Sequence, residues 1–128
     1  MPRNIIQPEG VWDPRPRFAQ VVRTGNTVYV AGQTSVDAEG KLVGKGEIEV
    51  QIRQVFRNLG KCLQAAGADF DRVVKLNIYS TDLDAHREVI TRVRRECFRE
   101  PVASTTVQVS RLVDPDWLVE VEAIAVLD

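Results

Sequence analysis

The sequence contains few of the residues on which metal and histidine chemistry depend: one histidine and two cysteines in 128 residues. His86, Cys62 and Cys97 are too few to form a zinc site of the common Cys/His type. An excess of charge of one sign is also lacking, because the net charge is −1. The composition therefore gives no bulk attraction to nucleic acid or to an anionic membrane surface. We expect no metal site, and neither nucleic acid nor a membrane is favoured as a partner.

Long hydrophobic runs are absent as well. No stretch approaches the ~20 apolar residues needed to cross a bilayer, and residues 1–8 lack the apolar segment of a signal peptide. The two cysteines are expected to be reduced, core-facing residues on separate helices. These features predict a cytoplasmic protein.

The remaining composition is typical of a globular protein, with 44% hydrophobic and 27% charged residues. The length suits one domain covering residues 1–128, in which the proline-rich residues 1–16 form an extended arm. Residues 17–23 and 27–31 are β-rich and flank Thr24-Gly25-Asn26, a pattern that predicts a hairpin. Residues 37–46 contain three glycines and predict a loop.

Helical spacing begins at Glu47 and ends before Gly67, and its apolar face comprises Ile48, Ile52, Val55, Phe56, Leu59 and Leu63. A second helix is predicted to start near Thr81 or Asp82 and to end at 99–101. Its expected apolar stripe contains Ala85, Val89, Val93 and Cys97. Strands are predicted at 73–79, 105–112 and 118–127. The order indicates an α+β fold with two helices on one face of a sheet.

Alternation along the strands predicts one aliphatic sheet face that suits the helices. Its residues are Val74, Leu76, Ile78, Val107, Val109, Val119, Val121, Ala123 and Ala125. The opposite face mixes Lys75, Asn77, Tyr79, Glu120 and Glu122 with Tyr29, Ile124 and Val126. This mixed face is either solvated or a partly polar subunit interface, and alternation alone leaves both open.

Glu120 and Glu122 point to the same side of a strongly β segment, ~6–7 Å apart. Carboxylates on a half-buried strand are costly unless they are paired or lie in a cleft. One interpretation is an ion pair with Lys75 or an arginine, and spacing alone favours it. The other is that one carboxylate positions or deprotonates a water molecule.

Three further patterns carry weaker signals. The glycine-rich segment 40–46 lacks the spacing of a phosphate loop. His86 lies off the predicted apolar stripe and is expected to be exposed. The second helix carries five arginines, interleaved with glutamates, which predict a solvated face without the aromatic platform of single-strand binders.

Several segments together resemble the RidA family, also called YjgF and known by an older endoribonuclease L-PSP label. They are VYVAGQ (28–33), NL and AAG in the first helix (58–59 and 65–67), VKLNIY with DL (74–79 and 82–83), ASTTV (103–107) and VEVEA (119–123). Each motif is modest, but their order and spacing extend over nearly the whole chain from about Phe18.

The resemblance implies a chorismate-mutase-like fold and a homotrimer, in which mixed sheet faces line a central barrel and ligand clefts lie between subunits. Active relatives hydrolyse reactive enamines and imines, such as 2-aminoacrylate, to keto acids and ammonia without a cofactor. In these relatives an arginine holds the substrate carboxylate through bidentate pairing. A glutamate on the last strand helps water to attack the imine carbon.

Only part of that machinery is present here. Glu120 matches the catalytic glutamate. Ser104 stands where relatives have the arginine and Thr106 where they commonly have cysteine, while Phe18 replaces a tyrosine and Ala31 a serine. Losing the guanidinium removes a charge-assisted contact worth ~1.5–3 kcal/mol.

The resemblance thus implies Glu120 as the catalytic residue, and the substrate-binding candidates are Ser104, Thr105, Thr106, Phe18 and Ala31. Arg15 or Arg17 from the arm is a hypothetical replacement for the missing arginine. Arg111 is not assumed to compensate, because many relatives also have arginine there. The first hypothesis is an imine or enamine hydrolase with altered substrate preference. The alternatives are a non-catalytic, ligand-binding or chaperone-like trimer and an RNA-cleaving protein.

Overall fold

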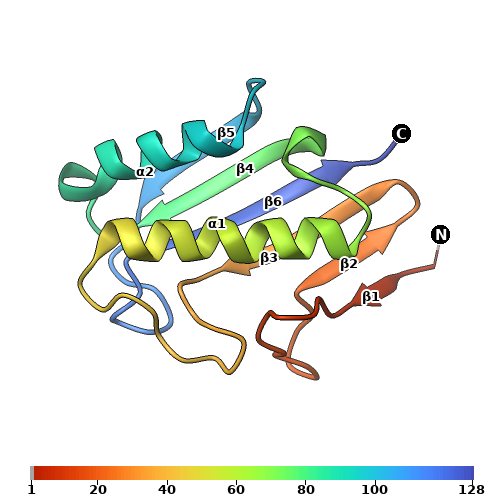
Figure 1. Cartoon of the computed structure of the whole chain (residues 1–128), viewed down its shortest axis with the longest axis horizontal. Coiled ribbons are helices and arrows are strands. Elements are labelled where there is room, and N and C mark those ends of the chain that lie inside the picture. Colours follow the sequence, from red (N-terminus) through yellow and green to blue (C-terminus); the bar gives the residue numbers. More distant parts are fainter. Residues whose placement is uncertain (1) are drawn as a thin grey trace.

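Two helices and a six-stranded mixed sheet build the chain, of which the computed structural model describes residues 2–128 (Figure 1). The strands are β1 (Asn4–Ile6), β2 (Val21–Thr24), β3 (Thr27–Gln33), β4 (Val73–Ser80), β5 (Ala103–Gln108) and β6 (Val119–Val126). The helices are α1 (Ile48–Ala65) and α2 (Leu83–Cys97), and a 3-10 turn spans Phe70–Arg72. The strand order is β1-β2-β3-β6-β4-β5, and among the neighbouring strands of residues 2–128 only the pair β4 and β5 is parallel.

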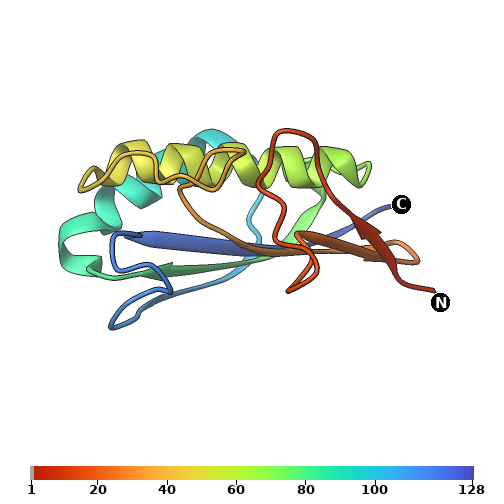
Figure 2. The same ribbon diagram turned by 90° about the horizontal axis from the view of Figure 1, so that it is seen from below.

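Both helices cover the same face of the sheet and leave the other face open, as Figure 2 shows. The core lies between the two layers, where Ile52, Val55 and Leu59 of α1 are fully buried. They meet Val119, Val121 and Ala125, which project from alternate positions of β6. Burial of each large side chain contributes roughly 1.5–3 kcal/mol to folding. The predicted α+β architecture with two helices on one face is confirmed.

Helix boundaries agree with the sequence signals. Asp82 caps α2, since its carboxylate accepts a hydrogen bond from the Ala85 amide at 3.1 Å. Gly67 follows α1 with a φ of 82°, a conformation in which glycine carries no steric penalty. The predicted stripe on α2 is confirmed for Val89, Val93 and Cys97, which pack on the core, whereas Ala85 is exposed and the buried face also contains Ile90. His86 is therefore half-buried beside that face rather than exposed.

The first hairpin is shorter than predicted, because β2 starts at Val21 and residues 17–20 form no strand. Part of the predicted arm belongs to the sheet. Its β1 segment pairs antiparallel with β2, placing Ile5 opposite Val22. The segment between β1 and β2 leaves the sheet and rises beside α1 (Figure 2).

Two face assignments were wrong. Val74 is 47% exposed, whereas Val73 is buried, because the register between β4 and β6 shifts between Val73 and Lys75. Such a bulge reverses the side on which the following residues point. On β5, which ends at Gln108, the side chains of Ser104 and Gln108 bond to α2 and its N-terminal turn, so Val107 faces away from the helices.

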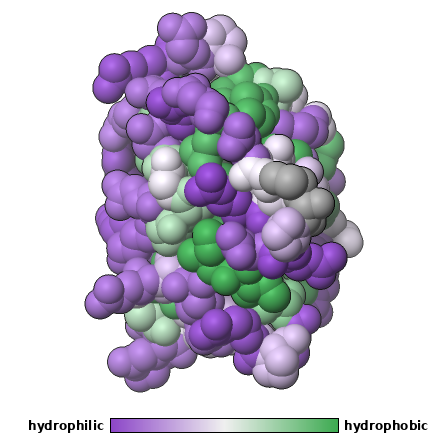
Figure 3. Space-filling model, turned by 90° about the vertical axis from the view of Figure 1, so that its right-hand side faces the viewer, coloured by the Kyte–Doolittle hydropathy of each residue, from purple (hydrophilic) through white to green (hydrophobic). Residues whose placement is uncertain are grey.

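Hydrophilic side chains cover most of the face that carries the two chain ends, with hydrophobic patches between them (Figure 3). Cys62 is buried and Cys97 half-buried, and both are free thiols on separate helices, as predicted. Burial raises the pKa of the Cys62 thiol to about 12. Within residues 2–128, neither helix has both the length and the apolar character to cross a bilayer.

Candidate functional site

A cavity of about 330 Å³ opens between the N-terminal arm, the end of β3 and the start of β6. Trp12, Arg17 and Phe18 line it from the arm, and Ala31 and Gly32 line it from β3. The opposite wall contains Trp117 and Glu120. The volume lies at the lower end of the ~300–1,000 Å³ typical of small-molecule sites. Most of the lining is apolar, with one carboxylate and one guanidinium.

Glu120 is the carboxylate of this cavity, and its environment disfavours the charged form. Burial raises the pKa of the Glu120 carboxyl above its ordinary value, and the negative charge of Glu122 adds to the increase. No group among the described residues donates a hydrogen bond to this carboxylate. Glu120 is thus a half-buried, partly desolvated acid without a protein hydrogen-bond donor, a state found among catalytic carboxylates.

Gly32 leaves the space that the Glu120 carboxylate occupies beside β3. A methyl group at Gly32 would overlap Oε2 of Glu120 and lie 2.7 Å from its Cδ. The backbone of β3 therefore approaches the carboxylate more closely than any residue with a side chain allows. Gly32 is required here for close approach rather than for an unusual φ.

Glu122 lies on the same face of β6, but unlike Glu120 it accepts hydrogen bonds from two side chains. Its Oε1 accepts from the Asn77 side-chain amide at 3.2 Å and from the Tyr79 hydroxyl at 3.3 Å. Burial raises the pKa of the Tyr79 phenol, and the charge of Glu122 raises it further. The predicted ion pair with Lys75 or an arginine was wrong: in residues 2–128 neither glutamate forms one.

Two buried polar side chains on α1 hold the loops that wall the cavity. Asn58 donates to the carbonyls of Thr34 and Val36 at 3.1 and 3.0 Å. Gln51 donates to the carbonyl of Asp116 at 3.0 Å and accepts from the Leu118 amide at 2.9 Å. Because these groups are buried, losing either partner would leave unsatisfied backbone polar atoms. Helix α1 thus holds in place both the loop after β3 and the loop before β6, which wall the cavity next to Glu120.

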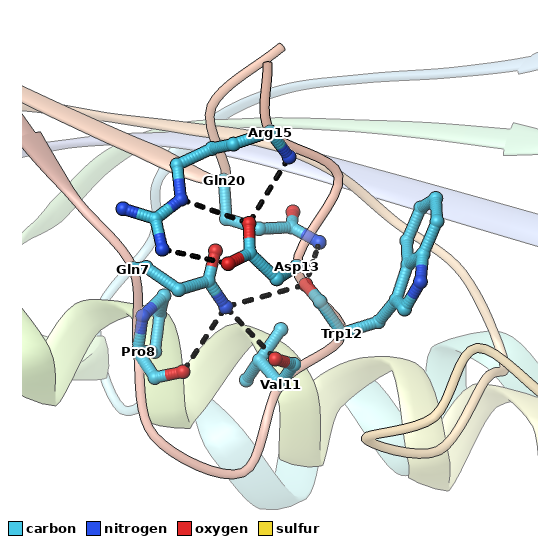
Figure 4. A network of polar contacts seen from close by, with 7 residues as sticks. All are labelled: Gln7, Pro8, Val11, Trp12, Asp13, Arg15 and Gln20. Carbon is cyan, nitrogen blue, oxygen red and sulfur yellow. Dashed lines mark hydrogen bonds and ion pairs between the residues drawn. The ribbon is translucent and has the colours of Figure 1, made fainter. Parts of the chain in front are cut away.

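The arm is held by a network that fixes the backbone of Trp12 (Figure 4). The side-chain amides of Gln7 and Gln20 donate to its carbonyl at 3.3 and 3.0 Å. Gln20 in turn accepts from Gln33 of β3 at 2.8 Å. The backbone of Trp12 is therefore anchored to the strand that carries Gly32.

The two arm arginines have different surroundings. Arg15 donates to the carboxylate of Asp13 at 2.9 and 2.6 Å (Figure 4). This pairing lowers the pKa of the Asp13 carboxyl. Arg17 lies over the Trp12 ring, 5.4 Å from its centroid, and lines the cavity. Trp12 also packs edge-to-face against Phe18 with centroids 6.3 Å apart.

The open sheet face contains a second, shallower hollow of about 280 Å³. Tyr29, Lys75 and Ile124 line it together with Asn77 and Glu122. The predicted mixed character of this face is confirmed, with Tyr29 47% exposed. No group of three or more potential metal ligands occurs among residues 2–128.

Comparison with known proteins places this geometry in a family. A family model described as Endoribonuclease L-PSP matches residues 11–127. The chain belongs to the RidA/YjgF family. A RutC family protein of Pyrococcus abyssi is 36% identical over 98% of both chains.

Two further members of the RidA/YjgF family extend the comparison. The 2-iminobutanoate/2-iminopropanoate deaminase of Dermatophagoides farinae is 32% identical over 99% of this chain and 98% of its own. The crystal structure of RidA from the Antarctic bacterium Psychrobacter sp. PAMC 21119 superposes with a TM-score of 0.88 at 33% identity, covering 97% of this chain and 99% of that one.

The RidA-type positions separate into two groups within the chain. Phe18, Ala31 and Glu120 all line the cavity. Ser104, Thr105 and Thr106 lie outside it, on the edge strand β5.

The side chains of β5 make contacts of their own. Ser104 Oγ accepts a hydrogen bond from Arg94 at 2.9 Å. Thr106 faces a small hollow against α2, lined by Leu83 and Ile90. A single chain therefore assembles only the first group of RidA-type positions.

Several residues of the site were missed by sequence reasoning, notably Trp12, Trp117 and Gly32. Trp12 and Trp117 had no periodic pattern to mark them, because both lie outside the helices and strands. Gln51 and Asn58 did carry a usable signal. Both interrupt the apolar face of α1, seven residues apart, and polar residues on a buried helix face require partners.

Proposed function

We propose that the protein is a hydrolase of small reactive imines or enamines and that the reaction takes place in the cavity around Glu120. The observation that carries the proposal is the half-buried Glu120 carboxylate, which has no protein donor and borders a small, mostly apolar cavity. Family membership supports the reaction class, since a relative of similar length is named as a 2-imino acid deaminase. No cofactor is part of the proposal.

In the proposed reaction Glu120 acts first as a base. Its carboxylate accepts a proton from a water molecule while the water oxygen forms a bond to the carbon of the protonated imine, and the electron pair of the C=N bond moves to nitrogen. Glu120 then delivers that proton to the nitrogen of the resulting carbinolamine. The C–N bond breaks and ammonia leaves while the Glu120 carboxylate takes up the hydroxyl proton and the carbonyl forms; this proton then passes to solvent. Imine and water are thus converted to a carbonyl compound and ammonia.

The raised pKa of Glu120 suits both steps, because a carboxyl with a pKa nearer neutrality is a stronger base and exchanges its proton more readily. Gly32 supports the same role by letting β3 approach the carboxylate closely. Glu122 is already hydrogen-bonded to Asn77 and Tyr79 and is not assigned a catalytic part.

The active form is proposed to be a homotrimer in which β5 of a neighbouring subunit contributes Ser104, Thr105 and Thr106 to the substrate cleft. Ser104 and Thr106, which face α2 in the single chain, would then reorient on assembly. The support is that all six residues of β5 are exposed and one edge of this strand has no partner strand within the described chain. The partly apolar hollow on the open face suits a subunit interface. Sedimentation should give three times the chain mass. An active monomer would contradict this assembly.

The test of the reaction is ammonia release from freshly generated 2-aminoacrylate and bulkier imines, measured above their spontaneous hydrolysis. Glu120→Gln removes the base without changing the shape of the side chain, and we expect kcat to fall about 100-fold or more. Glu122→Gln, two residues along the same strand, is the matched control and should stay within a few-fold of wild type. Full turnover by Glu120→Gln would overturn the mechanism, and no turnover of any imine would overturn the function.

The second candidate is ligand binding without turnover. The observation that favours it is that Phe18 and Ala31 offer the cavity no hydroxyl group, although they line it beside Glu120. In that case the wild-type protein binds small carboxylates but releases no ammonia from any imine. The same ammonia assay, run beside a binding measurement, separates the two functions.

A further inference from the structure

The cavity around Glu120 contains a single cationic side chain among its described lining residues, that of Arg17. No acidic group within residues 2–128 forms an ion pair with it, whereas Arg15, two residues earlier, is paired with Asp13. A guanidinium with free donors beside a cavity is a ready partner for a carboxylate. Because position 104 is a serine bonded to Arg94, β5 supplies no free guanidinium of its own at that position.

Arg17 is also held in place. Its guanidinium lies over the Trp12 ring at 5.4 Å, a cation–π contact that orients the planar group. The amides of Gln7 and Gln20 fix the Trp12 backbone (Figure 4). Gln20 in turn accepts a hydrogen bond from Gln33 of β3. The orientation of Arg17 is thus tied to the strand next to Glu120 rather than to a free arm.

We propose that Arg17 is the carboxylate-binding residue of this cavity, and that the cavity selects 2-imino carboxylates with an aromatic or branched apolar side chain. The substrate class rests on the proposed function, whereas carboxylate binding by Arg17 does not depend on turnover. One cation and one anion match a ligand with a carboxylate at one end and a protonated imine at the other. Arg17 takes the carboxylate, and Glu120 faces the imine.

The side-chain preference follows from the rest of the lining. Three aromatic residues, Trp12, Phe18 and Trp117, share the cavity with valines at 11, 36 and 113. A methyl group would leave much of this apolar surface in contact with water, whereas a phenyl or branched side chain covers it. Each buried CH₂ improves binding by about fourfold, from ~0.8 kcal/mol per group.

The experiment measures binding of three stable probes by calorimetry: propanoate, 3-phenylpropanoate and its neutral amide. The wild-type protein should bind 3-phenylpropanoate more tightly than either of the others. Arg17→Gln should weaken 3-phenylpropanoate binding about tenfold to a hundredfold. Arg17→Lys should recover part of the loss, because lysine keeps the charge without the bidentate geometry.

Two control variants test other arginines. Arg15→Gln removes an arm arginine already paired with Asp13, and Arg94→Gln removes the arginine bonded to Ser104. Both should bind 3-phenylpropanoate like wild type. The proposal is overturned if Arg17→Gln binds like wild type, if only Arg94→Gln weakens binding, or if the amide binds as tightly as the acid.

Turnover separates this inference from the proposed function. With imines generated from phenylalanine by an amino-acid oxidase, Arg17→Gln should raise KM while kcat changes little. Arg17-dependent carboxylate binding without ammonia release would uphold Arg17 and refute the hydrolase. Equal KM for wild type and Arg17→Gln, with normal ammonia release, would uphold the hydrolase and refute Arg17. Lower kcat/KM for the phenylalanine imine than for the alanine imine would refute the side-chain preference.

Discussion

Glu120 and Glu122 occupy the same face of the same strand, two residues apart, yet they differ in almost every physical respect. Glu122 accepts hydrogen bonds from Asn77 and Tyr79. Glu120 has no donor among the described residues, borders a cavity and has a raised pKa. Identical side chains on one strand thus become a structural acceptor and a candidate base. The neighbouring strands determine the difference, since β4 supplies the donors and β3 supplies Gly32.

The largest loss of activity should come from a substitution that displaces the Glu120 carboxylate but leaves residue 120 a glutamate. In Gly32→Ala the new methyl group overlaps the carboxylate, which lies at the end of a flexible side chain and can swing away. We expect a folded protein whose kcat falls about 100-fold, because a displacement of about 1 Å costs that much. The assay is ammonia release, combined with a crystal structure of the variant.

Gly60→Ala is the control for this substitution. Gly60 lies inside α1, and an added methyl group meets only ring atoms of Phe70 at 3.4 Å. This variant should keep full activity and gain up to about 1 kcal/mol in helix stability. If Gly32→Ala were as active as Gly60→Ala, the close approach of β3 would have no functional meaning.

An intermediate effect concerns stability as a function of pH. Because the pKa of Glu120 is raised in the folded state, the folded protein binds this proton more tightly than the unfolded chain does. Glu120 therefore lowers stability as pH rises from about 4.3, the ordinary glutamate value, through the raised pKa. At pH values above the raised pKa, the loss of stability caused by Glu120 no longer changes with pH.

Urea unfolding of wild type and Glu120→Gln measures this loss of stability. The range from about pH 4 to about pH 8 covers both an ordinary and a raised glutamate pKa. The variant should be the more stable protein at neutral pH, and its advantage should shrink as pH falls. Contributions from exposed carboxylates such as Asp13 and Glu96 cancel in the difference. An advantage that is the same at every pH would show that Glu120 is not desolvated.

The smallest effect should come from Glu122→Gln. The amide oxygen can still accept from Asn77 and Tyr79, so stability should change by less than about 1 kcal/mol. Removing the negative charge should lower the pKa values of both Glu120 and Tyr79, because Glu122 raises each of them. The acid limb of the kcat/KM profile should move to lower pH, and the tyrosinate absorbance should appear at lower pH. An unchanged profile would show that the two carboxylates do not interact.

Much of the fold was predictable because its signals are local. The spacing of apolar residues marked both helices, and Asp82 and Gly67 marked helix ends. Errors arose where pairing is not local. The bulge in β4 that exposes Val74 depends on the register with β6, and the orientation of β5 depends on its parallel partner.

The candidate site was predictable only in part. Family resemblance named Glu120, Phe18 and Ala31, which share a cavity, and Ser104 to Thr106, which do not join them within one chain. Sequence reasoning left Arg15 and Arg17 equivalent. Only the folded arm distinguishes them, because Asp13 lies next to Arg15, whereas Trp12 and the cavity lie next to Arg17.

The sequence by itself determined that one chain holds too few histidines and cysteines for a zinc site of the common Cys/His type, and that Glu120 and Glu122 share a face. The alternation of a β-strand requires the second result whatever the rest of the chain does. Only the tertiary structure decided which glutamate is left without a donor. That outcome depends on the register of β4 and on the approach of Gly32 from β3, both of which join residues distant in sequence.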